Sequence, residues 1–232
     1  MAISVPDFDH MFHDGARYQW RGGREAVVTV VQAGDLVMPS GQLTACDPFT
    51  GLVFEDQAAP FTVAVAPGRY PVLLALVAWT EPGKPVDEFA TYRNAAAKLV
   101  VGSEPAIRWH LAITEEQAQT PVDPADGKSY GYSVDSGTGS FLDRAALTAV
   151  AGLAAQFDGR LGESPLSEAL NAAGFSGAVN LPSPDGEATI IAFMSGPGDG
   201  CFPTWIGYDA ADRPTCFVTE FEYLRQAQPI PQ

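Results

Sequence analysis

The sequence predicts an α+β fold: a mostly antiparallel β-sheet, sandwich-like or strongly curved, with two short to medium helices packed on one face. Three observations favour this class. About ten short apolar or alternating segments are separated by turns rich in Gly, Pro and Asp. Only two segments have clear helical periodicity. These helices do not alternate with strands, as a parallel sheet built from βαβ units would require.

The stretch 188–223 carries the strongest strand and turn signals. Residues 188–194 are apolar and partly β-branched, as a buried strand requires. A glycine loop follows at 195–200, and residues 201–208 predict an aromatic-rich strand. A turn containing Asp and Pro then leads into the alternating residues 215–223. We therefore expect two successive hairpins, which would form a meander at the end of the sheet.

The glycine loop at 195–200 does not match a dinucleotide-binding fingerprint, because that motif opens a helix and the residues after this loop do not. Two interpretations remain open. In the first, the loop is a structural bend in which Asp199 accepts backbone hydrogen bonds, as Asp beside Gly often does. In the second, Asp199 and Asp209 meet at one end of the sheet and form a site.

Further strands precede this stretch. We expect them at 26–38, 61–66, 70–79, 97–101 and 106–113, with a shorter one within 130–143. Gly34-Asp35 predicts a bulge or turn inside the first of these strands. The segment 70–79 is almost wholly apolar, which indicates a central position in the sheet.

Two helices are expected in the second half of the chain. The first spans about 143–157, where a stripe of apolar residues recurs at helical spacing. The second spans 165–173, with Ser164 as N-cap, Pro165 at the first position and Gly174 after the end. Two shorter helical turns are indicated as well, one within 5–13 with Ser4 as N-cap and one after Thr114, which forms a capping-box pattern with Gln117.

The composition limits the class of protein. Of the 232 residues 46% are hydrophobic, which is enough for a substantial core, and no linker divides the chain, so we expect a single domain over residues 1–232. The formal net charge of −15, from 28 acidic and 13 basic residues, argues against nucleic-acid binding, which needs cations for the phosphates. The same charge is compatible with a basic protein partner.

The cysteines and the apolar segments bear on the compartment. Cys46, Cys201 and Cys216 form no closely spaced pair, which favours reduced, mostly buried thiols in the cytoplasm. The first residues lack the basic and apolar regions of a signal peptide. The longest apolar run, 72–79, is far too short to span a membrane. We therefore expect a cytoplasmic protein without a membrane partner. The oligomeric state is left open.

Several motifs occur in an order that resembles a known family. They are Cys-Asp-Pro at 46–48, Pro-Gly-Arg-Tyr-Pro-Val at 67–72, Arg-Asn-Ala-Ala-Ala at 93–97, Gly-Tyr-Ser-Val-Asp-Ser-Gly-Thr-Gly at 131–139 with Asp143, and Ser-Gly-Pro-Gly-Asp-Gly at 195–200 followed by Gly207 and Asp209. The order resembles a bacterial family known as domain of unknown function 4241 (DUF4241).

The resemblance covers about residues 35–223 and leaves 1–25 and 224–232 as extensions. It departs from the family at Glu220-Phe221, where the family tends to have Asp-Phe. It implies a bacterial, cytosolic, single-domain protein and supplies no activity.

The first functional hypothesis is a non-catalytic protein-binding module, of the kind that neutralises a toxin or confers immunity to one. The acidic balance and the β-rich plan favour it, and an acidic inhibitor of a basic toxin would gain association rate from charge alone. The residues that we expect to contribute to binding are Gly198, Asp199, Gly200 and Trp205.

The alternative is a metal-dependent or acid/base hydrolase. Carboxylates in glycine loops can hold a divalent cation or act as an acid/base pair, so a divalent cation is possible although no cofactor is predicted. Cys201 is a conceivable thiol nucleophile, without a histidine next to it in the sequence. The candidate catalytic residues are Asp135, Asp143, Asp199, Asp209 and His110, with Asp47 nearby. Convergence of these aspartates would favour the hydrolase, whereas backbone hydrogen bonds within their own loops would make them structural.

Overall fold

The computed structural model describes residues 4–20, 22–52, 58–120, 130–154, 164–174, 176–184, 186 and 189–231. Their strands form an eight-stranded sheet, a four-stranded sheet and a two-stranded pair, and all of these pairings are antiparallel. Helices are few and short. The predicted α+β class with a mostly antiparallel sheet is confirmed.

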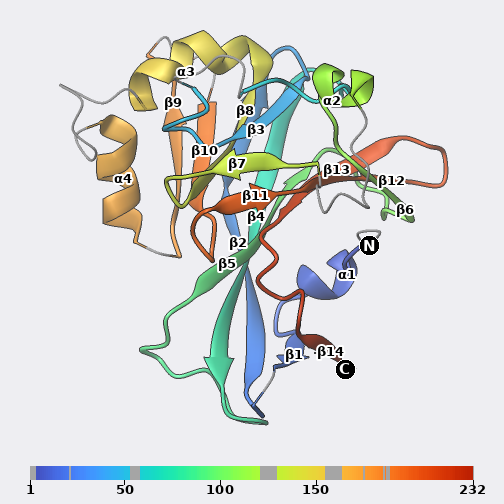
Figure 1. Cartoon of the computed structure of the whole chain (residues 1–232), viewed down its shortest axis with the longest axis vertical. Helices are drawn as coiled ribbons and strands as arrows, with labels where there is room; N and C mark the ends of the chain where they lie inside the picture. Colours follow the sequence, from blue (N-terminus) through green and yellow to red (C-terminus); the bar gives the residue numbers. More distant parts are fainter. Residues whose placement is uncertain are drawn as a thin grey trace.

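The larger sheet has the strand order β14-β1-β2-β4-β5-β13-β12-β6. Its two longest strands, β2 and β4, run the length of the molecule (Figure 1). A bulge between Gln32 and Gly34 interrupts their register, as Gly34-Asp35 predicted. The strands of this sheet are β1 (Arg17–Gln19), β2 (Glu25–Met38), β4 (Gly68–Thr80), β5 (Arg93–Val100), β6 (Arg108–Leu111), β12 (Thr204–Tyr208), β13 (Pro214–Glu220) and β14 (Gln228–Ile230).

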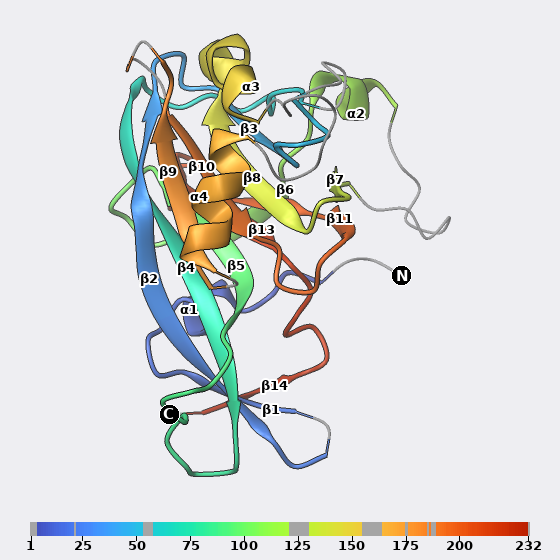
Figure 2. The same ribbon diagram turned by 90° about the vertical axis from the view of Figure 1, so that its left-hand side faces the viewer.

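The smaller sheet has the order β3-β8-β10-β9 and covers the upper half of the larger one (Figures 1 and 2). Its strands are β3 (Leu43–Cys46), β8 (Thr138–Asp143), β9 (Ala178–Pro182) and β10 (Thr189–Met194). The separate pair consists of β7 (Tyr132–Val134) and β11 (Gly200–Phe202). The hydroxyl of Thr189 accepts the backbone N–H of Val37 at 3.0 Å and so joins the two sheets directly.

Side-chain alternation along the strands produces three apolar clusters. The first fills the space between the two sheets, where Phe141 and Phe193 of the smaller sheet join Phe217 of the larger. The neighbouring residues Leu142 and Ala192 point the other way, as the period of a strand requires, and pack against helices. Those helices are α3 (Leu147–Ala154) and α4 (Pro165–Ala173), which lie together on the outer face of the smaller sheet (Figure 2).

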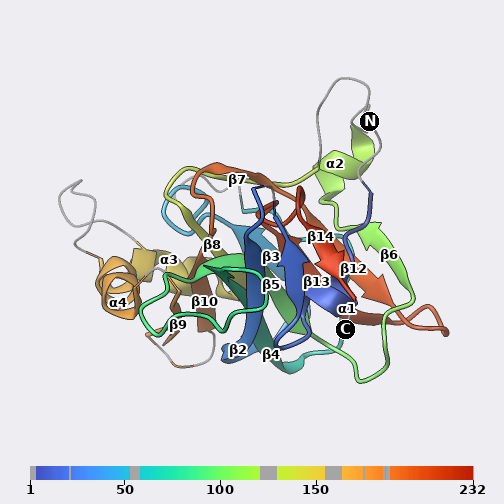
Figure 3. The ribbon, with the colours of Figure 1, turned by 90° about the horizontal axis from the view of Figure 1, so that it is seen from below.

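The third cluster lies on the other face of the larger sheet. The short helix α1 (Phe8–Met11) packs there, with Phe8 and Met11 buried against Trp205 and Val218. Figure 3 shows α1 near β14, the edge strand of this sheet, and away from α3 and α4. Strand β1 pairs with β14, so the two segments predicted as extensions are joined to each other at the edge of the sheet.

The helix signals are largely confirmed. Helix α4 has the bounds, the Ser164 N-cap and the Gly174 C-cap that the sequence predicts. The Thr114–Gln117 capping box opens α2 (Glu115–Gln119). The helix predicted from 143 begins with a 3-10 turn at Arg144–Ala146, and its predicted end at 157 lies outside the described residues. Asp7, and not Ser4, is the N-cap of α1.

Two strand predictions are wrong. Residues 61–66 form no strand, because Thr62 donates its N–H to Ile113 while Val65 donates to Gly41, and two different partners cannot build a ladder. The predicted strand 201–208 is divided at Pro203, which has no N–H to donate. Its first part pairs with β7 and its second part joins the larger sheet.

The division at Pro203 also corrects the expected meander. Strand β10 pairs with β8 and β9 in the smaller sheet and not with β11, so only β12 and β13 form a hairpin in this stretch. Within the described part of the chain, the helices are all too short to cross a membrane.

Candidate functional site

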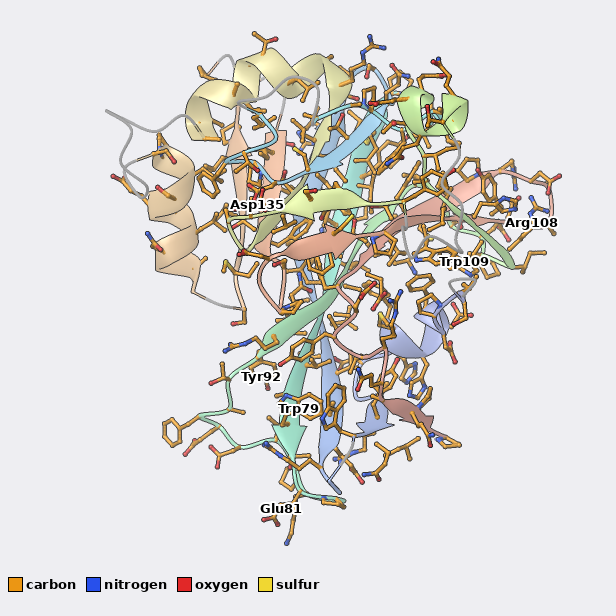
Figure 4. The ribbon with its side chains drawn as sticks, viewed as in Figure 1. Trp79, Glu81, Tyr92, Arg108, Trp109 and Asp135 are labelled. Atoms are coloured by element: carbon orange, nitrogen blue, oxygen red, sulfur yellow. The ribbon has the colours of Figure 1, made fainter. Side chains whose placement is uncertain are left out.

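An open cleft of about 650 Å³ lies between the glycine loop, the turn that joins β1 and β2, the C-terminal end of β4 and the residues after β13. Figure 4 shows one of its walls, Trp79, on the lower half of β4. The cleft combines aromatic rings with a few charged groups, and its lining residues come from four separate segments. They are Trp20, Arg24, Trp79, Pro197, Asp199, Gly200, Cys201, Phe202, Phe221, Glu222 and Tyr223.

The glycine loop, which forms one wall of the cleft, is held by hydrogen bonds of Ser195 and by a close contact of Gly196. The Ser195 hydroxyl donates to the carbonyl of Gly198, and the Ser195 N–H donates to the carbonyl of Gly137 at 2.9 Å. Gly196 has a φ of +66° and packs against the Asn94 carbonyl, where an added Cβ would lie 2.0 Å from that oxygen. Only glycine fits such a position. The loop therefore presents Asp199 to the cleft as part of a defined bend.

The opposite wall comes from the turn between β1 and β2. The N–H of Trp20 donates to the carbonyl of Arg24 at 2.9 Å, which closes the turn and brings both side chains to the cleft. The rings of Trp20 and Trp79 lie 4.8 Å apart between centroids in an edge-on arrangement. Tyr223 lies on the other side of Trp79, at 6.1 Å. Three aromatic rings thus form a continuous apolar surface that remains partly exposed.

Strand β13 ends in an unusual backbone conformation that completes the cleft. Glu222 adopts a φ of +57°, a left-handed conformation that is rare for a residue with a side chain. This turn carries the chain out of the sheet and places Tyr223 beside Trp79. The carboxylate of Glu222 pairs with Arg225 at 2.7 Å, and both side chains are at least one-third exposed, so the pair adds little stability.

The two acidic groups at the cleft differ in whether they already have a cationic partner. Asp199 is exposed, and within the described residues no cation pairs with it, whereas Glu222 has Arg225 as a partner. Arg24 is exposed on the opposite wall. A cationic group placed in the cleft would meet the exposed Asp199 and the aromatic rings of Trp20 and Trp79.

Cys201 lines the cleft, and its environment is that of a neutral thiol. Desolvation, and then the negative charge of Glu222, raise the pKa of the thiol above its usual value. A nucleophilic cysteine requires the opposite shift, produced by a nearby cation or by the end of a helix. The side chain is thus suited to contact a ligand through its sulfur, and not to attack one.

Two of the predicted site aspartates already accept hydrogen bonds that stabilise the surrounding structure. The buried Asp143 carboxylate accepts from the Ser40 hydroxyl at 2.7 Å and from the Ala145 N–H at 2.8 Å, which caps the 3-10 turn. Asp209 accepts the backbone N–H groups of Ala211 and Arg213 in the hairpin between β12 and β13. These hydrogen bonds and the Arg213 side chain hold the pKa of Asp209 below its usual value.

Asp47 has a larger structural role than the sequence suggests. Its carboxylate is 1% exposed and accepts four backbone N–H groups, two from its own turn and two from another segment. The latter belong to Asp135 and Ser136, at 2.9 and 2.8 Å. Asp47 thereby fixes the turn that leads from β7 to β8.

The remaining candidates do not all gather at one place, although Asp135 and Asp199 lie at the same end of the β7–β11 pair. Asp199 precedes β11 and Asp209 follows β12, at opposite ends of one extended segment, so they do not meet. Asp135 is exposed and lies apart from Arg108 and Trp109, the neighbours of His110 on edge strand β6 (Figure 4). Trp205 is buried against Phe8 and does not line the cleft. In the described ranges, no three His, Cys, Asp or Glu side chains are grouped to hold a metal ion.

Of the predicted binding residues, Asp199 and Gly200 line the cleft, and Gly198 belongs to the loop that bounds it. The sequence did not indicate Trp20, Trp79 or Tyr223, which lie far apart in the chain. The sequence gives only a weak signal for Trp79, as a large aromatic residue near the C-terminal end of an apolar strand.

The model of one protein family matches most of the chain, residues 36–219, and its description is "Protein of unknown function (DUF4241)". The chain therefore belongs to the DUF4241 family, as the order of its motifs predicted. Searches of curated proteins and of solved structures give no match. The matched region contains the glycine loop and Trp79, while Trp20, Arg24 and residues 221–223 lie in the flanking segments.

Proposed function

We propose that this protein is a non-catalytic protein-binding module whose cleft receives a lysine or arginine side chain of a basic partner. The observation that carries the proposal is the aromatic surface of Trp20, Trp79 and Tyr223 with the exposed carboxylate of Asp199 at its rim. A cation over aromatic faces gains about 0.5–2 kcal/mol, and a nearby carboxylate adds to the attraction.

The overall charge supports a basic partner. A formal charge of −15 attracts a cationic protein over long distances and speeds the encounter, while the cleft supplies a local anchor. A toxin that acts on an anionic substrate has the required basic surface, so neutralisation of such a toxin is one biological role that this chemistry fits. The rim cation Arg24 sets a limit on where the partner's charge can be placed, since like charges repel.

The experiment uses short peptides as probes. We expect a peptide with one central arginine to quench the tryptophan fluorescence of the protein, while the same peptide with norleucine does not. Trp79→Ala should lower the affinity about tenfold, since it removes a stacking surface. Phe89→Ala is the control, because Phe89 is 85% exposed and lies outside the cleft lining.

A matched pair of charge variants separates the cleft from the general acidity. Asp199 and Asp135 are both exposed and both adjoin the β7–β11 pair, but only Asp199 lines the cleft. We expect Asp199→Asn to weaken peptide binding about threefold to tenfold and Asp135→Asn to have a smaller effect. Equal effects of the two variants would show that the field of the whole protein, and not the cleft, attracts the peptide.

The hydrolase alternative rests on fewer residues than the sequence offered. The carboxylates of Asp143 and Asp209 already accept backbone N–H groups, which leaves Asp135 and Asp199. Asp135 follows Val134 and Asp199 precedes Gly200, and because Val134 pairs with Gly200, the two aspartates lie at the same end of the β7–β11 pair. Calorimetric titration with Mg²⁺ and Ca²⁺ tests this alternative, and binding that disappears in both Asn variants would favour it over the protein-binding role.

A further inference from the structure

A second cavity, of about 140 Å³, lies where the N-terminal segment, β1 and the segment after β13 come together. It shares no lining residue with the aromatic cleft. Its volume is several times the roughly 30 Å³ that one water molecule occupies in the liquid. Polar groups from Asp7, Tyr18 and Glu220 line it together with the apolar side chains of Met11 and Leu224.

Glu220 brings a carboxyl group into this cavity that has no cationic partner. The residue is 2% exposed, and burial raises its pKa to about 7, although the charge of Arg225 acts in the opposite direction. Arg225 lines the cavity, but its guanidinium forms an ion pair with Glu222 at 2.7 Å. Among the described residues no ion pair reaches Glu220. The backbone N–H of Glu222 donates one hydrogen bond to this carboxylate, but a buried carboxylate remains costly when no cation compensates its charge.

Tyr18 provides an independent sign of a missing partner. The side chain is 3% exposed, and within the described ranges its hydroxyl oxygen is buried without a hydrogen-bond partner. Burial and the negative charges of Asp7 and Glu220 raise the pKa of this hydroxyl, which places all three groups in one electronegative neighbourhood. Buried hydroxyl groups in native proteins are nearly always hydrogen-bonded.

We propose that this cavity binds a primary alkylammonium group, as found on a small amine or at the end of a lysine side chain. Its three N–H groups would donate to the Glu220 carboxylate, the Tyr18 oxygen and the Asp7 carboxylate, while a short alkyl chain would contact Met11 and Leu224. The number of acceptors matches the number of donors on an ammonium ion. The ligand would compensate the buried charge and satisfy the unpaired hydroxyl at once.

The test is a thermal-unfolding measurement at pH 8, where Glu220 is ionised. Methylammonium chloride should raise Tm by about 3 °C at ten times its dissociation constant. Sodium and tetramethylammonium chloride at the same ionic strength should not, because the first lacks N–H donors and the second is both bulky and without them. Nα-acetyl-lysine amide serves as the second arm and shows whether a lysine side chain can reach the cavity.

Two variants assign the response to this cavity. Glu220→Gln should abolish the Tm shift, and Tyr18→Phe, which removes only the unpaired hydroxyl, should reduce it. Should Glu220→Gln fail to fold, the Tyr18→Phe variant decides. Asp199→Asn should leave the shift unchanged, so a failure at the aromatic cleft is distinguishable from a failure here. A shift that sodium or potassium reproduces, or that survives in both cavity variants, would overturn the proposal.

Discussion

The carboxylate of Asp47 holds the backbone N–H of Ser136 at 2.8 Å, across 89 positions of sequence. It holds the N–H of Asp135 with the same oxygen and two further N–H groups of its own turn with the other. One buried side chain thereby connects the end of β3 to the turn between β7 and β8. This connection suggests the first of four predictions about the roles of the acidic and glycine residues.

Asp47→Ala should destabilise the protein by about 3 kcal/mol, because several backbone donors lose a charged acceptor in a place that water does not reach easily. The measurement is the free energy of unfolding from urea titration. Asp135→Ala is the control, because Asp135 takes part in this network only through its backbone N–H and its side chain is exposed. This variant should change stability by less than about 0.5 kcal/mol. Equal losses in both variants would contradict the assigned role of Asp47.

Asp209 should make the protein sensitive to acid. Its pKa in the folded state is lowered, chiefly by the backbone N–H of Arg213, so its stabilising effect is present above the pKa of the unfolded chain and is lost as the pH falls through the folded pKa. Asp209→Asn should therefore lower Tm at pH 7 and make Tm depend less on pH as the pH falls below the ordinary pKa of 3.8. Thermal melts as a function of pH test this. If the variant shows the same fall of Tm in acid as the parent protein, other carboxyl groups must dominate the acid sensitivity.

The glycines of the 195–200 loop should differ in their tolerance of a side chain. Gly196→Ala should cost about 2–3 kcal/mol, because its Cβ would lie 2.0 Å from the Asn94 carbonyl and its φ is positive. Gly198→Ala should cost only about 1 kcal/mol, since its φ is also positive but the space around it is open. Urea unfolding of the two variants compares them directly. The reverse order would mean that the loop can shift away from Asn94.

Glu220→Gln should stabilise the protein in alkaline solution. The folded-state pKa of Glu220 is about 7 against an ordinary value of 4.5, so the folded protein binds this proton more tightly than the unfolded chain. The stability that this provides is complete below pH 4.5 and is lost as the pH rises through about 7. The variant avoids that loss and should exceed the parent by on the order of 3 kcal/mol at pH 8 and by little at pH 4.5. Unfolding titrations at both pH values give the comparison, and a constant difference would contradict it.

Local signals in the sequence explain why part of the fold could be predicted. The caps of α4, the capping box of α2 and the bulge at Gly34 each depend on residues within a few positions, and all three are found. The strand divided at Pro203 could not be placed from local pattern, because both halves are apolar and only their partners differ. The failure at 61–66 has the same origin, since an apolar segment can be buried without a ladder.

The candidate site was predictable only in part, for a related reason. Asp199 and Gly200 stand in a loop that glycine marks in the sequence, and they do line the cleft. Trp20 and Tyr223 reach it through pairings at the two ends of the chain, and no local pattern connects them to Trp79. The burial of the Glu220 carboxyl group could not be predicted from the alternation of its strand, because burial at the end of a strand depends on which other segments pack over it.

The pairing of β1 with β14 has a consequence for how the molecule is made. During synthesis β1 and β2 leave the ribosome early, while β14 follows every other described strand in chain order. The outer edge of β1 therefore stays unpaired until β14 has been made, and exposed strand edges invite association with other chains. Nascent or C-terminally shortened chains should consequently be the species that chaperones must shield.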